Sequence, residues 1–421
     1  MADANVELAK ILALTNEEYD CFLKEKKREI LSFHLDNSSF YKQLSRIDAN
    51  VCWEDIPIMR KIDLQRPLQD RLTEGYSKGM VYINKTSGSS GDPFVFAKDK
   101  FCHALIWANI MRRFQWYGID FNQSLQARFY GMPLDWFANK QLRLKDFLSH
   151  RYRFNIFDFS DSALAKMVVK FRNTKFDYIN GYTGSIVLLA KYLQKKDLFL
   201  DTICPSLKVC IVTSEMLFEA DKILLEERLR IPIINEYGSA ELDIIALENP
   251  NGQWQVNSET LFVEIVDAND RVLPNGQEGR IIVTSLYNKA HPMIRYDVGD
   301  FGALDEKSTF KNPILKSLIG RTNDVALLPS GKKAPGMTFY SITKKLFDDQ
   351  GNVKEFVITQ TKLDVFEIDY SSETELTVRE IAGIKSVLDQ FLEPNLTYVF
   401  TRKQTIERSK SGKLKQFKSW L

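Results

Sequence analysis

NKTSGSSGDP, residues 84–93, lies between two short apolar runs at 80–83 and 94–97 that have strand character. Gly88 and Gly91 let consecutive backbone N–H groups turn toward one point, because glycine tolerates backbone conformations that other residues avoid. Hydroxyl groups add further donors at Thr86, Ser87, Ser89 and Ser90. Such a loop predicts a polyphosphate cradle, with an exposed Ser/Gly hairpin as the alternative. It is not a Walker A loop, because the G-x-x-x-x-G-K spacing is absent.

Composition is that of an ordinary globular protein with room for two or three domains. The chain has 421 residues, 44% of them hydrophobic and 27% charged, and a formal net charge of +2 that does not suggest a nucleic-acid partner. Five scattered cysteines indicate neither a disulfide framework nor a zinc site. No secretory leader or membrane-spanning run is apparent. We therefore expect a cytoplasmic protein with no nucleic-acid or membrane partner.

Between residues 161 and 237, strands alternate with helices of ten to fifteen residues. The expected helices are 161–172, 185–195 and 218–229, and the expected strands are 176–179, 207–212 and 231–235. This alternation indicates parallel β-α-β units. Ligands of such sheets bind beyond the carboxyl ends of the strands, where segments 213–215 and 235–241 would lie.

The remainder of the chain predicts two further parts. Strands at 261–266 and 279–285, separated by turn residues, indicate a β-rich subdomain. The last hundred residues predict a strand, a strand, a helix and a strand at 353–359, 365–370, 378–392 and 398–401. We expect an α/β fold. Its large N-terminal domain, 1–320, would consist of αβ-layered sheets with a β-rich subdomain at about 250–320, and its small α+β C-terminal lid domain would span 321–421.

Five stretches together resemble the adenylate-forming (ANL) superfamily of acyl-CoA synthetases, peptide-synthetase adenylation domains and luciferases. They are TSGSSGDP at 86–93, YGSAE at 237–241, RYDVGD at 295–300, GRTND at 320–324 and SGK at 411–413. The likeness covers about residues 40 to 420 and is closest to the branch of phenylacetate-CoA ligase, coenzyme F390 synthetase and CapK-like proteins. It implies an AMP-forming ligase that uses ATP and Mg²⁺ to adenylate a carboxylic acid and then transfers the acyl group, with CoA as the expected acceptor.

The resemblance assigns roles to the YGSAE stretch. Tyr237 would stack on adenine, Gly238 would let the backbone approach the nucleotide, and Ser239 would contact the α-phosphate. Glu241 would ligate Mg²⁺, because a carboxylate oxygen suits a hard cation. Taken alone, the stretch could also be a strand-to-helix turn with a surface glutamate.

The remaining nucleotide contacts are implied by the same resemblance. Asp300 would accept hydrogen bonds from both ribose hydroxyls, and Arg321 would contact the ribose or the phosphates. Further nucleotide-binding positions would be Thr86, Ser87, Gly88, Ser89, Ser90, Gly91, Ser214, Glu215, Asn235 and Glu236, with Glu215 on the adenine side. Asn323 occupies the hinge position, where relatives often have Asp or Lys.

Lys413 is the expected catalytic lysine. A lysine at this place in the family reaches the α-phosphate and the substrate carboxylate, where negative charge peaks in the transition state. Lys410 and Lys415 are the alternatives, and a solvated basic tail would explain the neighbouring charges equally well.

The acyl-substrate pocket is expected at Phe129, Tyr130, Gly131 and Tyr182. Residues 127–137 form a stretch dense in aromatic side chains, which we interpret as a loop, and aromatic core is the alternative to a pocket role. The sequence does not identify the acid, although aromatic content hints at an aryl substrate.

Several functions remain open beside CoA ligation. The acceptor could be an amine, a carrier-protein thiol or a hydroxyl that receives AMP, and a decayed nucleotide-binding protein is the non-enzymatic alternative. Family members often form homodimers, but no motif in this sequence decides the oligomeric state.

Overall fold

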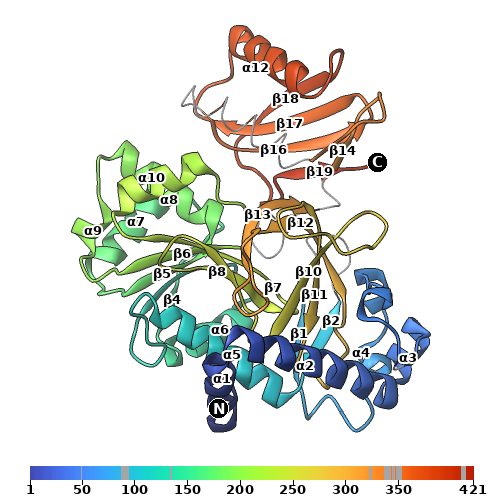
Figure 1. The fold of residues 1–421 in the computed structure, drawn as a ribbon. Helices are drawn as coiled ribbons and strands as arrows, with labels where there is room; N and C mark the ends of the chain where they lie inside the picture. Colours follow the sequence, from blue (N-terminus) through green and yellow to red (C-terminus); the bar gives the residue numbers. More distant parts are fainter. Residues whose placement is uncertain are drawn as a thin grey trace. The chain divides into compact units, whose positions relative to one another are not determined.

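The computed structural model describes the chain apart from residues 49, 87–93, 133–134, 322–324, 336–342, 344–346, 348–352 and 409–413. The chain forms two compact units, each made from two separate stretches. Unit 1 comprises Met1–Phe121 and Ile234–Leu318, and unit 2 comprises Asn122–Ile233 and Ile319–Leu421. Figure 1 labels their elements. The expected division into domains 1–320 and 321–421 stays a prediction.

The helices of unit 1 begin with two helices near the N-terminus. They are α1 (Ala2–Ala13), α2 (Asn16–Asn37), α3 (Ser39–Ser45), η1 (Trp53–Asp55), η2 (Lys61–Leu64), α4 (Leu68–Arg71) and α5 (Lys100–Gln115). The break between α1 and α2 is a capping box: the Thr15 hydroxyl accepts from the Glu18 N–H, and the Glu18 carboxylate accepts from the Thr15 N–H. The capping box therefore divides the N-terminal segment into two helices.

The sheet of unit 1 has the strand order β10-β11-β12-β13-β9-β8-β7. Its strands are β7 (Ile233–Ser239), β8 (Asp243–Glu248), β9 (Trp254–Val256), β10 (Leu261–Val266), β11 (Gly279–Ser285), β12 (Tyr296–Leu304) and β13 (Ile314–Arg321). The β7–β8, β8–β9, β9–β13, β10–β11 and β11–β12 pairs are antiparallel. This confirms the β-rich character predicted for the stretch, and β10 and β11 have the bounds expected from the sequence.

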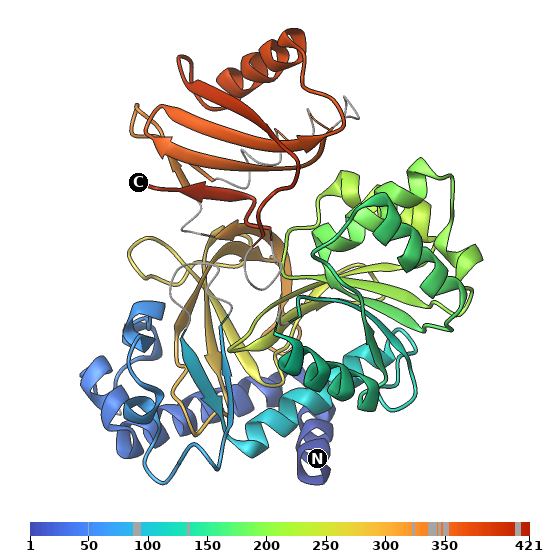
Figure 2. The ribbon, with the colours of Figure 1, turned by 180° about the vertical axis from the view of Figure 1, so that it is seen from behind.

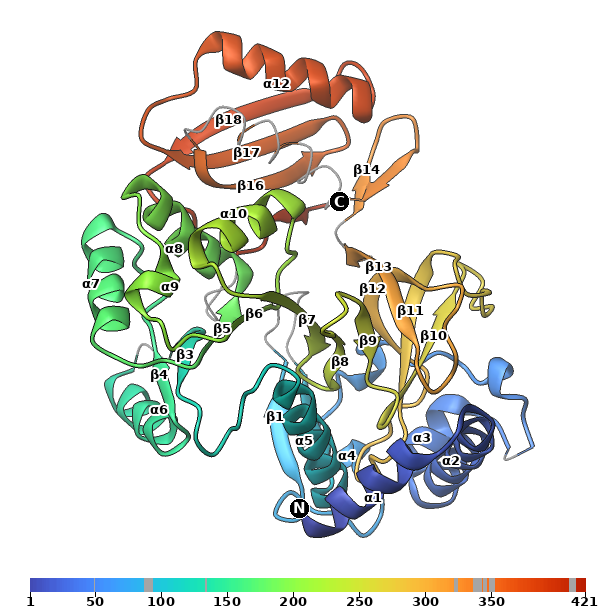
Figure 3. The same cartoon turned by 60° about the vertical axis from the view of Figure 1, so that its left-hand side comes forward.

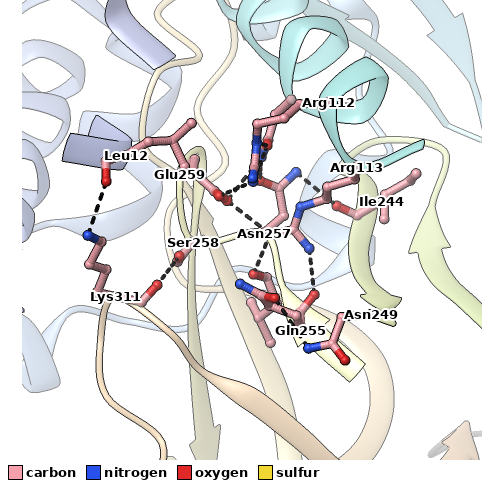
Figure 4. Close-up of polar contacts among 12 residues, drawn as sticks. Leu12, Arg112, Arg113, Ile244, Asn249, Gln255, Asn257, Ser258, Glu259 and Lys311 are labelled. Atoms are coloured by element: carbon pink, nitrogen blue, oxygen red, sulfur yellow. Dashed lines mark hydrogen bonds and ion pairs between the residues drawn. The ribbon is translucent and has the colours of Figure 1, made fainter. Parts of the chain in front are cut away.

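A buried ionic cluster fastens α5 to the turn after β9 (Figure 4). The fully buried Arg113 donates to Glu259 at 2.9 Å and to the carbonyls of Gln255 and Val256 at 2.7 Å. Arg112 donates to the other oxygen of Glu259 at 2.6 Å. Burial opposes ionisation, but the two guanidinium groups lower the pKa of Glu259, which stays charged. Removal of one partner would leave a buried, unpaired charge and would destabilise the fold, so the cluster holds α5 against the turn after β9.

The first part of unit 2 is the parallel β-α-β structure predicted from the sequence. Its strands are β3 (Gln126–Phe129), β4 (Arg151–Arg153), β5 (Tyr178–Tyr182) and β6 (Val209–Thr213), in the order β6-β5-β3-β4 with parallel pairs throughout. Its helices are α6 (Trp136–Leu148), α7 (Asp161–Arg172), α8 (Thr183–Lys195), α9 (Leu200–Ile203) and α10 (Glu219–Leu229). The bounds of α7 agree with the prediction.

The C-terminal part of unit 2 is the expected α+β structure. A sheet of order β18-β17-β16-β19 is built from β16 (Val353–Lys362), β17 (Val365–Ser372), β18 (Thr397–Lys403) and β19 (Phe417–Ser419). The helix α12 (Val378–Phe391) covers one face of it (Figure 3), where Ile384 and Leu388 join the apolar core with Ile358 and Phe366. A short hairpin, β14 (Val325–Leu327) and β15 (Lys333–Pro335), precedes this sheet.

No helix within the described residues combines the length and the apolar character needed to cross a membrane.

Candidate active site

A β-hairpin in unit 1 carries the Ser/Gly stretch. Strands β1 (Tyr82–Lys85) and β2 (Val95–Lys98) are antiparallel and lie beside the unit 1 sheet in Figures 1 and 2, with Phe94 and Tyr296 in ring contact at 6.4 Å. Thr86 closes the base of the loop: its N–H donates to the Phe94 carbonyl, and its hydroxyl accepts from the Phe94 N–H at 3.1 Å. Ser87, Gly88, Ser89, Ser90 and Gly91 lie outside the described residues. The expectation of two strands around the loop is thus confirmed.

The YGSAE stretch lies on a strand and the turn after it. We expected the strand to end at Asn235 and the stretch to form a turn, but β7 continues to Ser239 and returns directly into the antiparallel β8. A β-bulge lies between Tyr237 and Gly238. A Cβ at Gly238 would be 2.2 Å from the carbonyl oxygen of Asp243, so only glycine permits this close approach.

Two tyrosine–carboxylate hydrogen bonds join this hairpin to β12. The Tyr237 hydroxyl donates to Asp300 at 2.8 Å, and the Tyr296 hydroxyl donates to Glu241 at 3.0 Å. Each motif therefore supplies one tyrosine and one acid. The structure brings Tyr237, Glu241 and Asp300 together in unit 1, as the sequence analysis required of a shared nucleotide site.

The carboxylate of Glu241, the predicted magnesium ligand, is buried in the turn between β7 and β8. In the described part of the chain, the Tyr296 hydroxyl is its only hydrogen-bonding partner. No group of three or more His, Cys, Asp or Glu side chains among the described residues is arranged to hold a metal ion. Mg²⁺ usually takes one or two carboxylates and completes its ligand set with water and substrate phosphates, so a single carboxylate fits this cation.

The other predicted residues of β7 are held by the hairpin itself. Asn235 donates its backbone N–H to Glu248 at 3.0 Å, and Glu236 lies opposite Leu247. The Ser239 hydroxyl accepts from the Leu242 N–H at 3.3 Å and closes the turn. The roles assigned to these residues toward a nucleotide stay predictions.

In unit 2, Glu215 accepts backbone hydrogen bonds from two distant segments. One oxygen accepts from the Gly184 N–H at 2.7 Å, and the other accepts from the Leu414 N–H at 3.0 Å. Gly184 lies in the first turn of α8, whose N-cap residue, Tyr182, provides no side-chain cap. The carboxylate therefore satisfies an unpaired amide and places negative charge at the favourable end of the helix. Ser214, just before it, is exposed and has a positive φ of 70°.

The residues on either side of 409–413, Arg408 and Leu414, both contact other parts of unit 2. Leu414 is held by Glu215, and Arg408 pairs with Glu355 of β16 and lies 5.5 Å from the Phe159 ring centroid. Burial raises the pKa of Glu355, while the Arg408 charge opposes that effect. Lys413, Lys410 and the hinge residue Asn323 lie outside the described residues, and Arg321 is the last residue of β13.

The residues expected at the acyl pocket fall into two groups. Phe129 is fully buried among Phe154 and Phe171, which is the core alternative. Tyr130 and Tyr182 instead contact each other, with ring centroids 4.9 Å apart. Burial, with the nearby Glu215 charge, raises the pKa of Tyr182 to about 12, so its phenol stays protonated at neutral pH.

Two further features bear on the expected pocket. The Gly131 carbonyl accepts from Arg153 at 3.0 Å. The expected aromatic loop at 127–137 is wrong at both ends, because residues 127–129 belong to β3, and Trp136 and Phe137 begin α6 and are exposed. Asp135 starts that helix by accepting from the Ala138 N–H, which explains why the chain is helical there.

The comparisons agree with this geometry. Protein CapK from Staphylococcus aureus is 22% identical over 334 residues, covering 72% of this chain and 69% of that protein. Phenylacetate-coenzyme A ligase from Pseudomonas putida is 23% identical over 322 residues, covering 72% and 71%. A crystal structure of 2-hydroxyisobutyryl-CoA ligase, in the postadenylation state with R3-HIB-AMP, matches with a TM-score of 0.73 and 16% identity, covering 95% of this chain and 89% of that one. No family model matches the chain.

These matches support the expected likeness to the adenylate-forming superfamily. The expected likeness to that superfamily and the α/β fold are thereby confirmed, and the CoA ligases among the matches agree with the expected AMP-forming ligase.

One residue of this adenylate-forming site was missed by the sequence analysis. Tyr296 stood inside the RYDVGD stretch without a role, yet its hydroxyl holds the carboxylate of Glu241. Strand alternation gave no signal for this contact, because the β11–β12 pairing is irregular between Asp297 and Phe301 of β12.

Proposed function

We propose that the protein couples ATP to the activation of a carboxylic acid and transfers the acyl group to CoA. The observation that carries this proposal is the pair of tyrosine–carboxylate bonds, Tyr237 to Asp300 and Tyr296 to Glu241, which unites two motifs of the superfamily. The relatives support the same chemistry, since one is named a phenylacetate-CoA ligase. A solved neighbour, 2-hydroxyisobutyryl-CoA ligase, holds 2-HIB-AMP and CoA in its thioesterification state.

In the first half-reaction, a carboxylate oxygen of the acid attacks the α-phosphorus of ATP. The new P–O bond gives the acyl-adenylate, the bond between the α-phosphorus and its bridging oxygen breaks, and pyrophosphate leaves. Glu241 would hold Mg²⁺, which supplies positive charge next to the phosphates. Tyr296 keeps the Glu241 carboxylate in place, and Lys413 would neutralise charge that develops at the α-phosphate.

In the second half-reaction, the CoA sulfur attacks the acyl carbon and AMP leaves. Tyr237 and Asp300 would keep hold of the adenosine during both steps, and the hydrogen bond between them sets the direction of each side chain. Because no side chain needs to form a covalent bond, catalysis rests on positioning and on electrostatics.

The nearest alternatives to CoA ligation differ only in the molecule that accepts the acyl group or the AMP. Transfer to an amine, to a carrier-protein thiol or of AMP to a hydroxyl would use the same adenylating residues. A cytoplasmic location and a homodimer stay predictions.

Acid-dependent ATP–pyrophosphate exchange tests the proposal. The purified protein is incubated with ATP, Mg²⁺, labelled pyrophosphate and a panel of aryl and short hydroxylated acids, first without CoA. Exchange with at least one acid, followed by thioester formation when CoA is added, is the expected result. If exchange occurs but no thioester forms, and an added amine captures the acyl group instead, then the acceptor is an amine and not CoA. If the protein binds ATP but catalyses exchange with none of the acids, the proposed adenylating activity is wrong.

A further inference from the structure

The helix α6 of unit 2 places its most apolar side on the surface. Five large side chains, each at least 59% exposed, lie within thirteen residues: Trp136, Phe137, Leu144, Phe147 and Leu148. Every other described helix of eight or more residues carries at most one exposed large apolar side chain. An amphipathic helix of a globular protein normally turns such a stripe toward the core.

Helical geometry shows that the exposure is systematic. At about 100° per residue, Ala138, Leu142 and Asp146 fall on one side of α6, and this side faces the protein. Asp146 is buried and pairs with Arg153 of β4 at 2.7 Å, which fastens the helix beside that strand (Figure 3). The five apolar residues fall on the opposite side, in a stripe about 120° wide.

The charges around this stripe have one sign. Lys140, Arg143 and Lys145 are the exposed charged residues of α6, since the one acid of the helix, Asp146, is buried in its ion pair. Lys140 lies within the stripe, between Phe147 and Leu144 around the helix, and its ammonium group is 3.9 Å from the Trp136 ring centroid in a cation–π contact. Arg143 and Lys145 lie on either side of the stripe. Asp135, before the helix, is engaged in capping it.

A tryptophan, phenylalanines and leucines on one side of a surface helix, with one lysine among them and an arginine and a lysine beside them, match a helix that lies in the interface of an anionic membrane. The aromatic side chains enter the boundary between headgroups and acyl chains, and the cations remain with the anionic headgroups. A second copy of the same face fits less well, because pairing it with itself would bring the cations of both copies together.

We infer that α6 is a peripheral membrane-docking helix that binds anionic lipid bilayers through this stripe. The inference concerns a surface that is separate from the residues proposed to handle ATP. It requires neither a membrane span nor a leader, which are the features that the sequence analysis considered.

Vesicle co-sedimentation of the full chain tests this inference. Wild-type protein is mixed with vesicles of phosphatidylcholine alone, or of phosphatidylcholine with about one-third phosphatidylglycerol, at low and at 0.5 M salt. We expect about tenfold more bound protein on the anionic vesicles than on the neutral ones, and a marked loss at high salt. No binding to anionic vesicles, or equal binding to both kinds, would overturn the inference.

Matched variants locate the surface. Phe147→Glu should lower binding to anionic vesicles about tenfold, because it removes an apolar contact and adds repulsion. Ile223→Glu, which makes the same change at a lone exposed apolar residue of α10, should leave binding unchanged. Both variants should keep the wild-type melting temperature and ATP–pyrophosphate exchange without vesicles. Equal losses in the two variants would contradict a role for α6.

Size-exclusion chromatography separates the membrane from a second copy of the chain. If α6 docks on lipid, Phe147→Glu elutes as the wild type does. A wild-type dimer that Phe147→Glu converts to a monomer, with no vesicle binding by either, would assign the stripe to self-association and overturn the inference.

Discussion

Two glutamates, one in each unit, follow strands and were both expected at the nucleotide site, yet they are held in different ways. In unit 1, Glu241 receives one hydrogen bond from the described part of the chain, and the Tyr296 hydroxyl donates it. In unit 2, both oxygens of Glu215 are engaged by backbone N–H groups, those of Gly184 and Leu414. A carboxylate with both oxygens committed to the backbone organises the chain, whereas one oriented by a single hydroxyl retains capacity for a cation. The comparison suggests that Glu241 serves chemistry and Glu215 serves position.

The largest expected loss of activity is that of a Lys413 variant, and the effects of the two glutamates are compared with it. Lys413→Ala should reduce acid-dependent ATP–pyrophosphate exchange by about a thousandfold or more, because it removes a positive charge from the developing transition state. ATP binding, measured by calorimetry, should remain close to wild type. Lys410→Ala and Lys415→Ala are the matched controls, and near-normal exchange in Lys413→Ala would remove that residue from its role.

Glu241→Gln should reduce exchange by about a hundredfold. The amide keeps an oxygen that can accept from Tyr296 but lacks the charge that favours Mg²⁺. Exchange measured across a Mg²⁺ titration should show a higher requirement, with an unchanged melting temperature. The same Mg²⁺ requirement as wild type would show that Glu241 is not the metal ligand.

Tyr296→Phe should have a smaller effect of the same kind. Loss of the hydroxyl frees the Glu241 carboxylate to rotate, and removal of an outer partner typically lowers metal affinity about tenfold. The apparent Mg²⁺ constant should rise while the rate at saturating Mg²⁺ changes little. A loss of rate that Mg²⁺ does not restore would indicate a packing defect, and the melting temperature would then fall as well.

Glu215→Ala should have the smallest effect on catalysis. Its loss leaves two backbone N–H groups without this partner and removes the cap of α8, which costs about 1 kcal/mol of stability. We expect exchange to fall by about two- to fivefold, with a lower melting temperature and no change in the Mg²⁺ requirement. If Glu215→Ala lowers exchange as much as Glu241→Gln does, then Glu215 has a catalytic role and the proposed difference between the two glutamates is wrong.

Local signals predicted much of the fold. The α7 helix has its apolar period and a Ser160 cap within one short stretch, and β10 and β11 have clear strand composition. The extension of β7 through Ser239 could not be predicted, because it depends on pairing with β8. The α6 helix was missed because its aromatic residues suggested a loop or a core, and only the structure shows that they face outward.

In the candidate site, too, some features could be predicted from the sequence and others could not. Tyr237, Glu241 and Asp300 were identified by their motifs, but the hydrogen bonds from Tyr237 to Asp300 and from Tyr296 to Glu241 join residues 63 and 55 positions apart. The contact of Glu215 with Leu414 spans 199 positions. No periodicity or propensity encodes which hydroxyl or amide a carboxylate will meet at such a separation, so these partners required the folded chain.

The interleaved order of the two units has a consequence for synthesis on the ribosome. Apolar residues of α2 and α3, such as Ile30 and Phe40, share a core with Val263 and Val283 of the later strands. At 5 to 20 residues per second, the N-terminal segment of unit 1 waits roughly 10 to 40 s for residue 318 to be made. During that interval the 122–233 segment can form its own parallel sheet. The nascent N-terminal helices are thus the part of this protein that most needs a chaperone.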